Sequence, residues 1–331
     1  YRTGMSCRVD MLFTMFMVLG MYGLYRWSME EGMHSLPWWS ILWLSGATLT
    51  KGPAGIVLPC LVTWITVALC GHKLWRCTWK LCLVALASMV LPAIWYLAAY
   101  ERGGQAFLQL VADENFKRMT GNMTYDSHVH PWWYNLTSLL GGMAPYTLLV
   151  AMSLFCLLIP NVRRAITSEV GRWRSAESPR FFMFIAPLVV LVFYCIPASK
   201  RSVYLLPMYP FLAMQVGVLS LWLCRRCPGM VRSFVGVMAV LSMGAFTLFC
   251  LMHNPAFTGR FTPELSIEAM QTISGLMSPA PVWQYVLGGV VAATALVVFI
   301  RLFRDSGEVS VIGMFSVMIT LFWAFGGIYQ P

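Results

Sequence analysis

Ten stretches of mostly apolar residues, separated by short polar segments, run through the chain. A helix needs about 20 apolar residues to cross a bilayer, with a range of about 17–25. Measured against this length, the pattern predicts ten membrane-spanning helices and an all-α, polytopic transmembrane bundle. The predicted spans are residues 11–27, 38–50, 54–71, 81–100, 137–159, 181–197, 204–223, 233–252, 282–300 and 309–329.

The second stretch is shorter than the others, and this leaves two interpretations. Residues 38–50 and 54–71 are either two spans joined by a turn or one helix kinked at Pro53. A single kinked helix would invert the orientation of everything upstream, because proline removes a backbone donor without necessarily ending a membrane helix.

The composition is that of a membrane protein. The chain is 59% hydrophobic and only 11% charged, and soluble domains carry about 25% charged residues. Its net charge of +10 comes from basic residues scattered over short loops rather than gathered on one face, which argues against a nucleic-acid partner. We interpret the basic residues as topology determinants and phosphate ligands.

The ten cysteines show no regular spacing, so they do not predict a disulfide framework. Most lie within apolar stretches and are interpreted as small buried hydrophobic residues. Cys224 and Cys227 form a C-x-x-C, but no second pair is present that would complete a zinc site.

The basic residues also predict the orientation of the bundle. When the connections are assigned alternately to two sides, one side collects 14 of the 23 Lys and Arg residues, and this side is expected to be cytoplasmic. The outer side then carries two long loops, residues 101–135 and 253–281. We expect one transmembrane domain over residues 1–331, truncated at both ends, because the chain begins at Tyr1 within a few residues of an apolar stretch and stops directly after another.

The interiors of the predicted spans contain no Asp, Glu, Lys, Arg or His. Ion-coupled transporters usually place such residues near the middle of the membrane. We therefore expect the charge chemistry of this protein to lie at the membrane surface.

Cations on the outer side need an explanation, because Lys and Arg in short loops normally mark the cytoplasmic side. Lys51 lies in a T-K-G-P turn, and Lys200 and Arg201 lie between two apolar stretches, followed by Tyr204. One interpretation is that these residues bind the phosphate of a lipid. The alternative is that Lys51 only extends its ammonium group to water and that Tyr204 is an ordinary interfacial aromatic residue.

The 101–135 loop supplies further candidates. Arg118 lies one helical turn from Glu114 and either binds phosphate or forms a structural ion pair with it. His128 and His130 precede three aromatic residues that we expect to anchor the loop or stack on a sugar. A weaker alternative makes Glu114, His128 and His130 ligands of a divalent metal ion, the one cofactor that the sequence leaves open.

Asp10 lies at the mouth of the first predicted span, two residues after Arg8. It either pairs with Arg8 or serves as the carboxylate that orients and deprotonates an acceptor hydroxyl.

Together, the motifs R-x-D (Arg8 to Asp10), T-K-G-P (Thr50 to Pro53), E-N-F-K-R (Glu114 to Arg118) and S-K-R-x-x-Y-L-L-P (Ser199 to Pro207) resemble those of the integral-membrane GT-C glycosyltransferases. Within this class the sequence is most similar to the lipid A aminoarabinose transferases and the related protein O-mannosyltransferases. The resemblance implies an enzyme of the bacterial inner membrane with its active site on the periplasmic face. Its implied donor is a sugar carried on undecaprenyl phosphate.

The same resemblance assigns roles to individual residues. Lys51, Arg118 and Tyr204 match positions that hold the lipid phosphate, with Lys200 and Arg201 beside them, and Asp10 matches a carboxylate of the site. The transfer is expected to be inverting, and the acceptor is lipid A, another periplasmic glycolipid or a protein hydroxyl. A flippase for a lipid-linked sugar is the alternative from another functional class.

The chain departs from the family pattern in two ways. Asn115 stands where the family often has histidine, which puts a family-like metal site in doubt. The external loop that carries the acid usually regarded as the catalytic base would precede Tyr1, so we expect this chain by itself to bind donor poorly and to be inactive.

Overall fold

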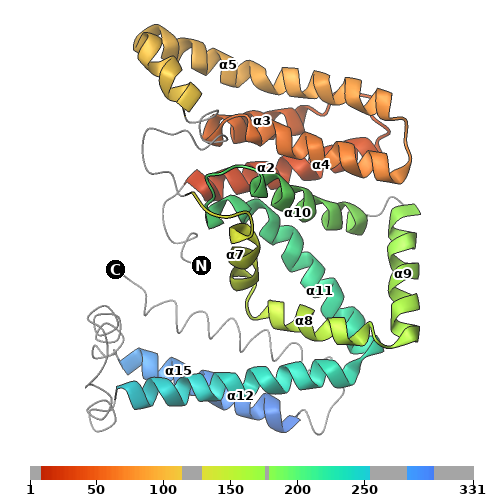
Figure 1. The fold of residues 1–331 in the computed structure, drawn as a ribbon, viewed down its shortest axis with the longest axis vertical. Helices are drawn as coiled ribbons and strands as arrows, with labels where there is room; N and C mark the ends of the chain where they lie inside the picture. The colour runs from red at the N-terminus through yellow and green to blue at the C-terminus, as the bar shows by residue number, and fades with distance from the viewer. Residues whose placement is uncertain (1–8, 114–128, 176–178, 254–281, 302–331) are drawn as a thin grey trace. The chain divides into compact units, whose positions relative to one another are not determined.

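The computed structural model describes residues 9–113, 129–175, 179–253 and 282–301 (Figure 1). Within these ranges the regular structure is helical, apart from one isolated antiparallel bridge between Val129 and Ser199. The all-α class predicted from the sequence is therefore confirmed for the described residues. The chain divides into two compact units.

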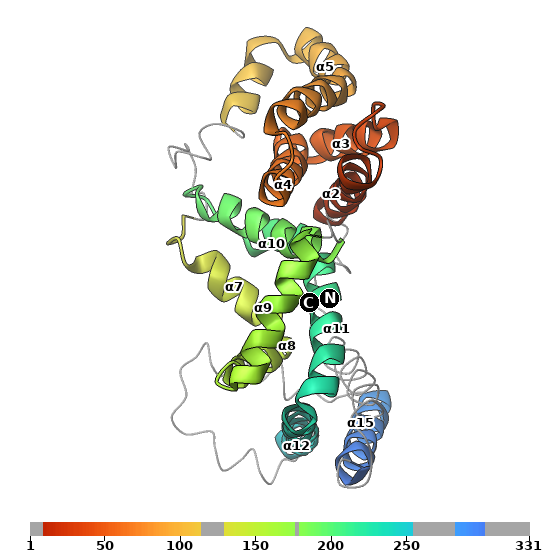
Figure 2. The same ribbon diagram turned by 90° about the vertical axis from the view of Figure 1, so that its right-hand side faces the viewer.

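The larger unit comprises Thr3–Thr147 and Leu158–Val218. It opens with four helices in succession: α2 (Val9–Tyr25), α3 (Trp38–Lys51), α4 (Ala54–Cys70) and α5 (Leu74–Ala112). α3 packs against α2, α4 and α5, and these helices lie side by side in Figures 1 and 2. The short connections between them reverse the chain at each step, so the start of α2 and the end of α3 meet at the same end of the bundle.

A glycine turn separates α3 from α4. Gly52 follows the last residue of α3 with φ of +82°, a conformation that other residues adopt only with strain. Gly55 crosses so close to α3 that an added Cβ would lie 2.6 Å from the carbonyl carbon of Ala47. The structure therefore has two helices here, and the alternative of one helix kinked at Pro53 is not observed.

The core of this unit is formed by apolar side chains from α2, α4, α10 (Pro179–Cys195) and the 3₁₀ helix η3 (Ser202–Met208). Fully buried examples are Met17, Met21, Leu58, Val62, Ala186, Val190 and Leu205. These contacts hold the ends of α2, α3, α10 and η3 near one another. The unit is completed by α7 (Tyr134–Gly142), α9 (Pro160–Ser175) and the first part of α11 (Tyr209–Arg226).

Within the described residues, the smaller unit comprises Leu148–Leu157 and residues 219–253 and 282–301. Its main elements are α12 (Pro228–Met252) and α15 (Val282–Arg301), which pack side by side (Figures 1 and 2). Ala239, Val291 and Ala295 are buried between them. Most of α8 (Tyr146–Cys156) and the end of α11 also belong to this unit.

Four helical segments in the described residues are long and apolar enough to cross a membrane: Leu74–Ala112, Ser202–Arg226, Pro228–Leu251 and Val282–Arg301. α7 and α8 count as a fifth only if they are taken together, because they are bent by 99° at their break. The segment predicted as one span over residues 137–159 is thus two helices. The count of ten spans stays a prediction: α4 and α10 are apolar but have 17 residues each, and residues 309–329 lie outside the described residues.

The structure describes part of the first predicted outer loop and almost none of the second. Residues 101–112 are helical, with a break in helical geometry at Gly104, and residues 114–128 lie outside the described residues, so the outer-face segment 101–135 stays a prediction. The 253–281 loop lies outside the described residues except for His253.

Candidate functional site

Lys51 and Asp10 form an ion pair at one end of the larger unit. Lys51 is the last residue of α3 and Asp10 lies in the first turn of α2, so the reversal of the chain brings these two residues together. Their side chains are 19% and 10% exposed. One interpretation of the sequence paired Asp10 with Arg8, which lies outside the described residues. In the structure Asp10 forms an ion pair with Lys51.

Aromatic rings surround the Lys51 ammonium group. Its nitrogen lies 5.4 Å from the ring centre of Phe13 and 4.6 Å from that of Tyr204. Cations within about 6 Å of an aromatic ring centre are attracted by the negative face of the ring. The ammonium group is therefore held by one carboxylate and two rings in a partly dehydrated position, where its attraction for an anion is stronger than in water.

Tyr204 brings an unsatisfied hydroxyl group to this position. Its oxygen is buried and has no hydrogen-bond partner within the described residues. The Tyr204 ring packs against that of Tyr194 at a centre-to-centre distance of 5.4 Å. Buried hydroxyl groups are normally hydrogen-bonded, so an unpaired one beside a cation indicates a place where a ligand oxygen can bind.

Asn135 holds the backbone of Tyr194, one residue of the aromatic pair, through a hydrogen bond. Its side-chain amide is fully buried and donates a 2.7 Å hydrogen bond to the backbone carbonyl of Tyr194. The Asn135 oxygen Oδ1 is buried and, within the described residues, unpaired. Phe13, Tyr194 and Asn135 were not recognised from the sequence, because an aromatic or amide residue within an apolar stretch looks the same whether it packs or binds.

Lys200 has a different environment from the one expected. Its side chain is buried, and Nζ donates to the carbonyl oxygens of His130 at 3.1 Å and Pro197 at 2.6 Å. The His130 amide donates to the carbonyl of Ala198 at 3.4 Å. Lys200 therefore ties the segment before α7 to the segment before η3 through two of its three ammonium protons.

The other predicted residues are not brought together in the same way. Arg201 is exposed in extended backbone just before η3, three positions from Tyr204. The ring of His130 stacks on that of Tyr134, 4.0 Å between centres, and the described residues contain no group of three metal-ligating side chains. Glu114, Arg118 and His128 lie outside the described residues, so the phosphate-binding and metal-ligand roles predicted for them stay predictions.

An apolar groove lies along α4 and α10. It has a volume of about 300 Å³ and is lined by Leu61 and Ile65 of α4 and by apolar side chains between Ile185 and Ile196. One lining residue, Phe193, directly precedes Tyr194 in α10.

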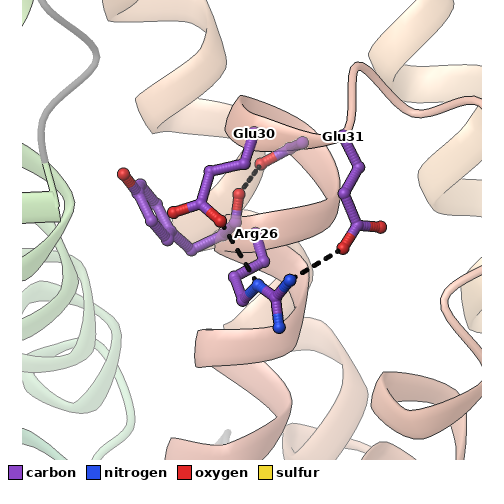
Figure 3. Close-up of polar contacts among 5 residues, drawn as sticks. Arg26, Glu30 and Glu31 are labelled. Atoms are coloured by element: carbon purple, nitrogen blue, oxygen red, sulfur yellow. Dashed lines mark hydrogen bonds and ion pairs between the residues drawn. The ribbon is translucent and has the colours of Figure 1, made fainter.

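Charged residues near the other end of α2 form a structural cluster. Arg26 lies 3.2 Å from Glu30 and 3.5 Å from Glu31 (Figure 3), and the hydrogen bond with Glu30 raises the pKa of Arg26. All three side chains are about half exposed, so these pairs stabilise the fold weakly. Lys80 donates a hydrogen bond to the carbonyl of Met33, which joins two segments predicted to be cytoplasmic.

The helices of the described residues form a fold like that of the GT-C membrane glycosyltransferases. The chain is similar to the crystal structure of ArnT from Cupriavidus metallidurans bound to undecaprenyl phosphate, with a TM-score of 0.62 and 21% identity. The apo state of the same protein gives a TM-score of 0.59 with 20% identity. Each comparison covers 96% of this chain and 53% of ArnT.

Sequence comparison agrees with the structural comparison. The chain is 24% identical over 180 residues to the undecaprenyl phosphate-alpha-4-amino-4-deoxy-L-arabinose arabinosyl transferase of Pectobacterium atrosepticum, which covers 54% of this chain and 29% of that enzyme. It is 28% identical over 207 residues to an uncharacterized protein of Aquifex aeolicus, covering 61% of this chain and 36% of that protein. The chain thus spans between 29% and 53% of the length of these relatives. No protein-family model matches it.

Proposed function

We propose that this chain carries the donor-phosphate site of a glycosyltransferase that takes its sugar from a polyprenyl phosphate. The supporting observation is the Lys51 ammonium group, held by Asp10 and two aromatic rings next to the unpaired Tyr204 hydroxyl. A phosphate placed here would accept hydrogen bonds from both donors. The similarity to ArnT, whose crystal structure contains undecaprenyl phosphate, supports the same class of donor.

The apolar groove on α4 and α10 suits the isoprenoid tail of such a donor. Its lining is almost entirely apolar, and its lining residue Phe193 directly precedes Tyr194. A donor with its phosphate at Lys51 and its tail in the groove would contact both features at once.

The chemistry follows from this position. The bond between the anomeric carbon and the phosphate oxygen breaks, and a bond to the acceptor oxygen forms on the opposite face of the sugar, which inverts the anomeric centre. Negative charge grows on the departing polyprenyl phosphate, and Lys51, Tyr204 and Arg201, with Arg118, stabilise it. Losing one such contact typically raises the barrier by about 2.7–4 kcal/mol.

Asp10 is the described carboxylate best placed to accept the acceptor proton. In the structure it is paired with Lys51. A donor phosphate competes with Asp10 for the same ammonium group, and a carboxylate released in this way is free to deprotonate a hydroxyl. The acceptor is a periplasmic glycolipid such as lipid A, and the enzyme lies in the bacterial inner membrane with this site on its periplasmic side.

The test is transfer of a labelled sugar by the full-length protein reconstituted in liposomes with a radiolabelled polyprenyl-phosphate sugar. Label should appear on a new acceptor, and Lys51→Ala and Arg118→Ala should each abolish this while membrane insertion is unchanged. Lys73→Met is the matched control, because Lys73 is an exposed lysine just before α5. Movement of the donor across the bilayer without transfer would identify a flippase, and normal transfer by Lys51→Ala would refute the proposed phosphate site.

A further inference from the structure

The helices of the larger unit distinguish its two ends. α3 ends at Lys51 and α4 begins at Ala54, and α10 ends just after Tyr194, which packs against Tyr204. The start of α4 and the end of α10 therefore lie at the candidate site, and the end of α4 and the start of α10 lie at the opposite end. α4 and α10 have 17 residues each, so the two ends are about 25 Å apart, close to the hydrocarbon thickness of about 30 Å.

Exposed tryptophans mark the membrane surface at this opposite end. Trp38 and Trp39 begin α3, and Trp75 and Trp79 lie in the first two turns of α5, which starts shortly after the end of α4. The exposed fractions of these four side chains are between 60% and 84%. Tryptophan is enriched at the level of the lipid headgroups, because its ring is apolar and its N–H group is polar. The headgroups of one leaflet therefore lie at this end of the unit.

α9 lies at the same end. It comes directly before α10, packs against α4 and α10, and runs across their direction (Figures 1 and 2). Val162 is buried, and Ile166 and Trp173, which share its face of the helix, are partly buried. Arg180, in the first turn of α10, lies 6.0 Å from the ring centre of Trp173. α9 is therefore an amphipathic helix that is fixed to the unit by its apolar face and lies along the membrane surface.

The exposed side of α9 carries two arginines without an acidic partner. Arg163 and Arg164 are exposed, and neither forms an ion pair within the ranges that the structure describes. Arg172, two turns further along, lies 2.6 Å from Glu169. The positive charge that is not neutralised is therefore concentrated in the first turns of α9. Arginine suits phosphate oxygens, because its planar group presents several N–H donors and is only weakly hydrated.

We propose that α9 is an interfacial helix whose Arg163 and Arg164 bind anionic phospholipid headgroups, in the leaflet that faces away from the Lys51 site. Charge selects this occupant. A headgroup with a net negative charge, such as that of phosphatidylglycerol, gains from two unpaired cations at headgroup depth. The phosphate of phosphatidylcholine is already balanced by its own quaternary ammonium group. The surface lies at the other end of the unit from the proposed donor site, so the two proposals are independent.

The experiment uses the full-length protein in phosphatidylcholine liposomes that contain a small fraction of phosphatidylglycerol with a photoreactive group on its headgroup. After irradiation, peptide mass spectrometry maps the labelled segments. In the wild type, α9 should be labelled several-fold more by this probe than by phosphatidylcholine carrying the same reactive group.

Three variants show whether the arginines carry the effect. In Arg163→Gln/Arg164→Gln the labelling of α9 should fall by about 25-fold, since each basic residue near an anionic surface contributes roughly a factor of five in affinity. Arg163→Lys/Arg164→Lys keeps both charges and should retain most of the labelling. The matched control Arg102→Gln removes an exposed arginine late in α5 and should label α9 like the wild type.

Three results would overturn the proposal. Equal labelling of wild-type α9 by the two probes would show that charge does not select the lipid. Label on the start of α5 without label on α9 would show that α9 does not lie at headgroup depth. Both are read from the wild type, so neither depends on whether a variant folds. The third result is undiminished labelling of α9 in Arg163→Gln/Arg164→Gln.

Discussion

The ion pair between Asp10 and Lys51 should be energetically coupled, and its strength can be measured by a double-mutant cycle. Lys51→Met removes the charge and keeps most of the side-chain length, and Asp10→Asn removes the opposite charge with little change in shape. Each single variant leaves one charged group in a site where the two side chains are only 19% and 10% exposed. Each should therefore destabilise the protein strongly.

The magnitude follows from burial. Removing one partner of a buried ion pair costs about 3–5 kcal/mol, and the residual exposure of Lys51 favours the lower end, about 3 kcal/mol. Large domains lose about 2–4 °C in unfolding temperature per kcal/mol, so each variant should unfold about 6–12 °C below the wild type. The double variant leaves neither charge unpaired, so its cost should fall short of the sum by about 2 kcal/mol, within the usual range for contacting residues.

The assay is thermal unfolding of the purified chain in detergent, with Lys73→Met as the control for loss of an exposed lysine. The control should stay within about 0.5 kcal/mol of the wild type. Additive costs of Asp10→Asn and Lys51→Met would refute the reasoning, because additivity means that the two groups do not interact.

Three further predictions concern neighbouring positions. Tyr204→Phe should leave the unfolding temperature unchanged, because the hydroxyl has no partner in the described residues. In a titration, the same variant should bind undecaprenyl phosphate about 10-fold more weakly, the effect of losing one hydrogen bond to a charged group. Lys200→Met should lower stability by about 1–3 kcal/mol in thermal unfolding, because the carbonyls of His130 and Pro197 lose their donor. An unchanged unfolding temperature would contradict the role of Lys200 in joining the segment before α7 to the segment before η3. Gly52→Ala should cost about 1–3 kcal/mol in the same assay, because alanine is strained at φ of +82°, and a neutral effect would show that the turn can relax.

Much of the fold could be predicted from apolar periodicity and turn residues. The stretches at 11–27, 54–71, 233–252 and 282–300 correspond closely to α2, α4, α12 and α15. The length of α5 and the bend between α7 and α8 could not be predicted, because an apolar pattern does not say where a helix continues past the membrane surface or where tertiary packing breaks it.

The candidate site was predictable only in part. The sequence singled out Lys51, Asp10 and Tyr204 because they stand at the ends of apolar stretches, and the structure brings these three together. It could not reveal that Asp10 pairs with Lys51, because that depends on which helix ends are neighbours. It also could not reveal that Lys200 is buried against two carbonyl groups, since a charged residue in a loop is normally expected to face water.

The most direct test of the central claim is binding of undecaprenyl phosphate to the full-length protein in detergent, measured by native mass spectrometry for wild type, Lys51→Met and Lys73→Met. The account predicts that wild type and Lys73→Met bind alike and that Lys51→Met binds at least about 10-fold more weakly, because a hydrogen bond to a charged group contributes about 1.5–3 kcal/mol. Equal binding by wild type and Lys51→Met would contradict the claim that the Lys51 ammonium group holds the donor phosphate.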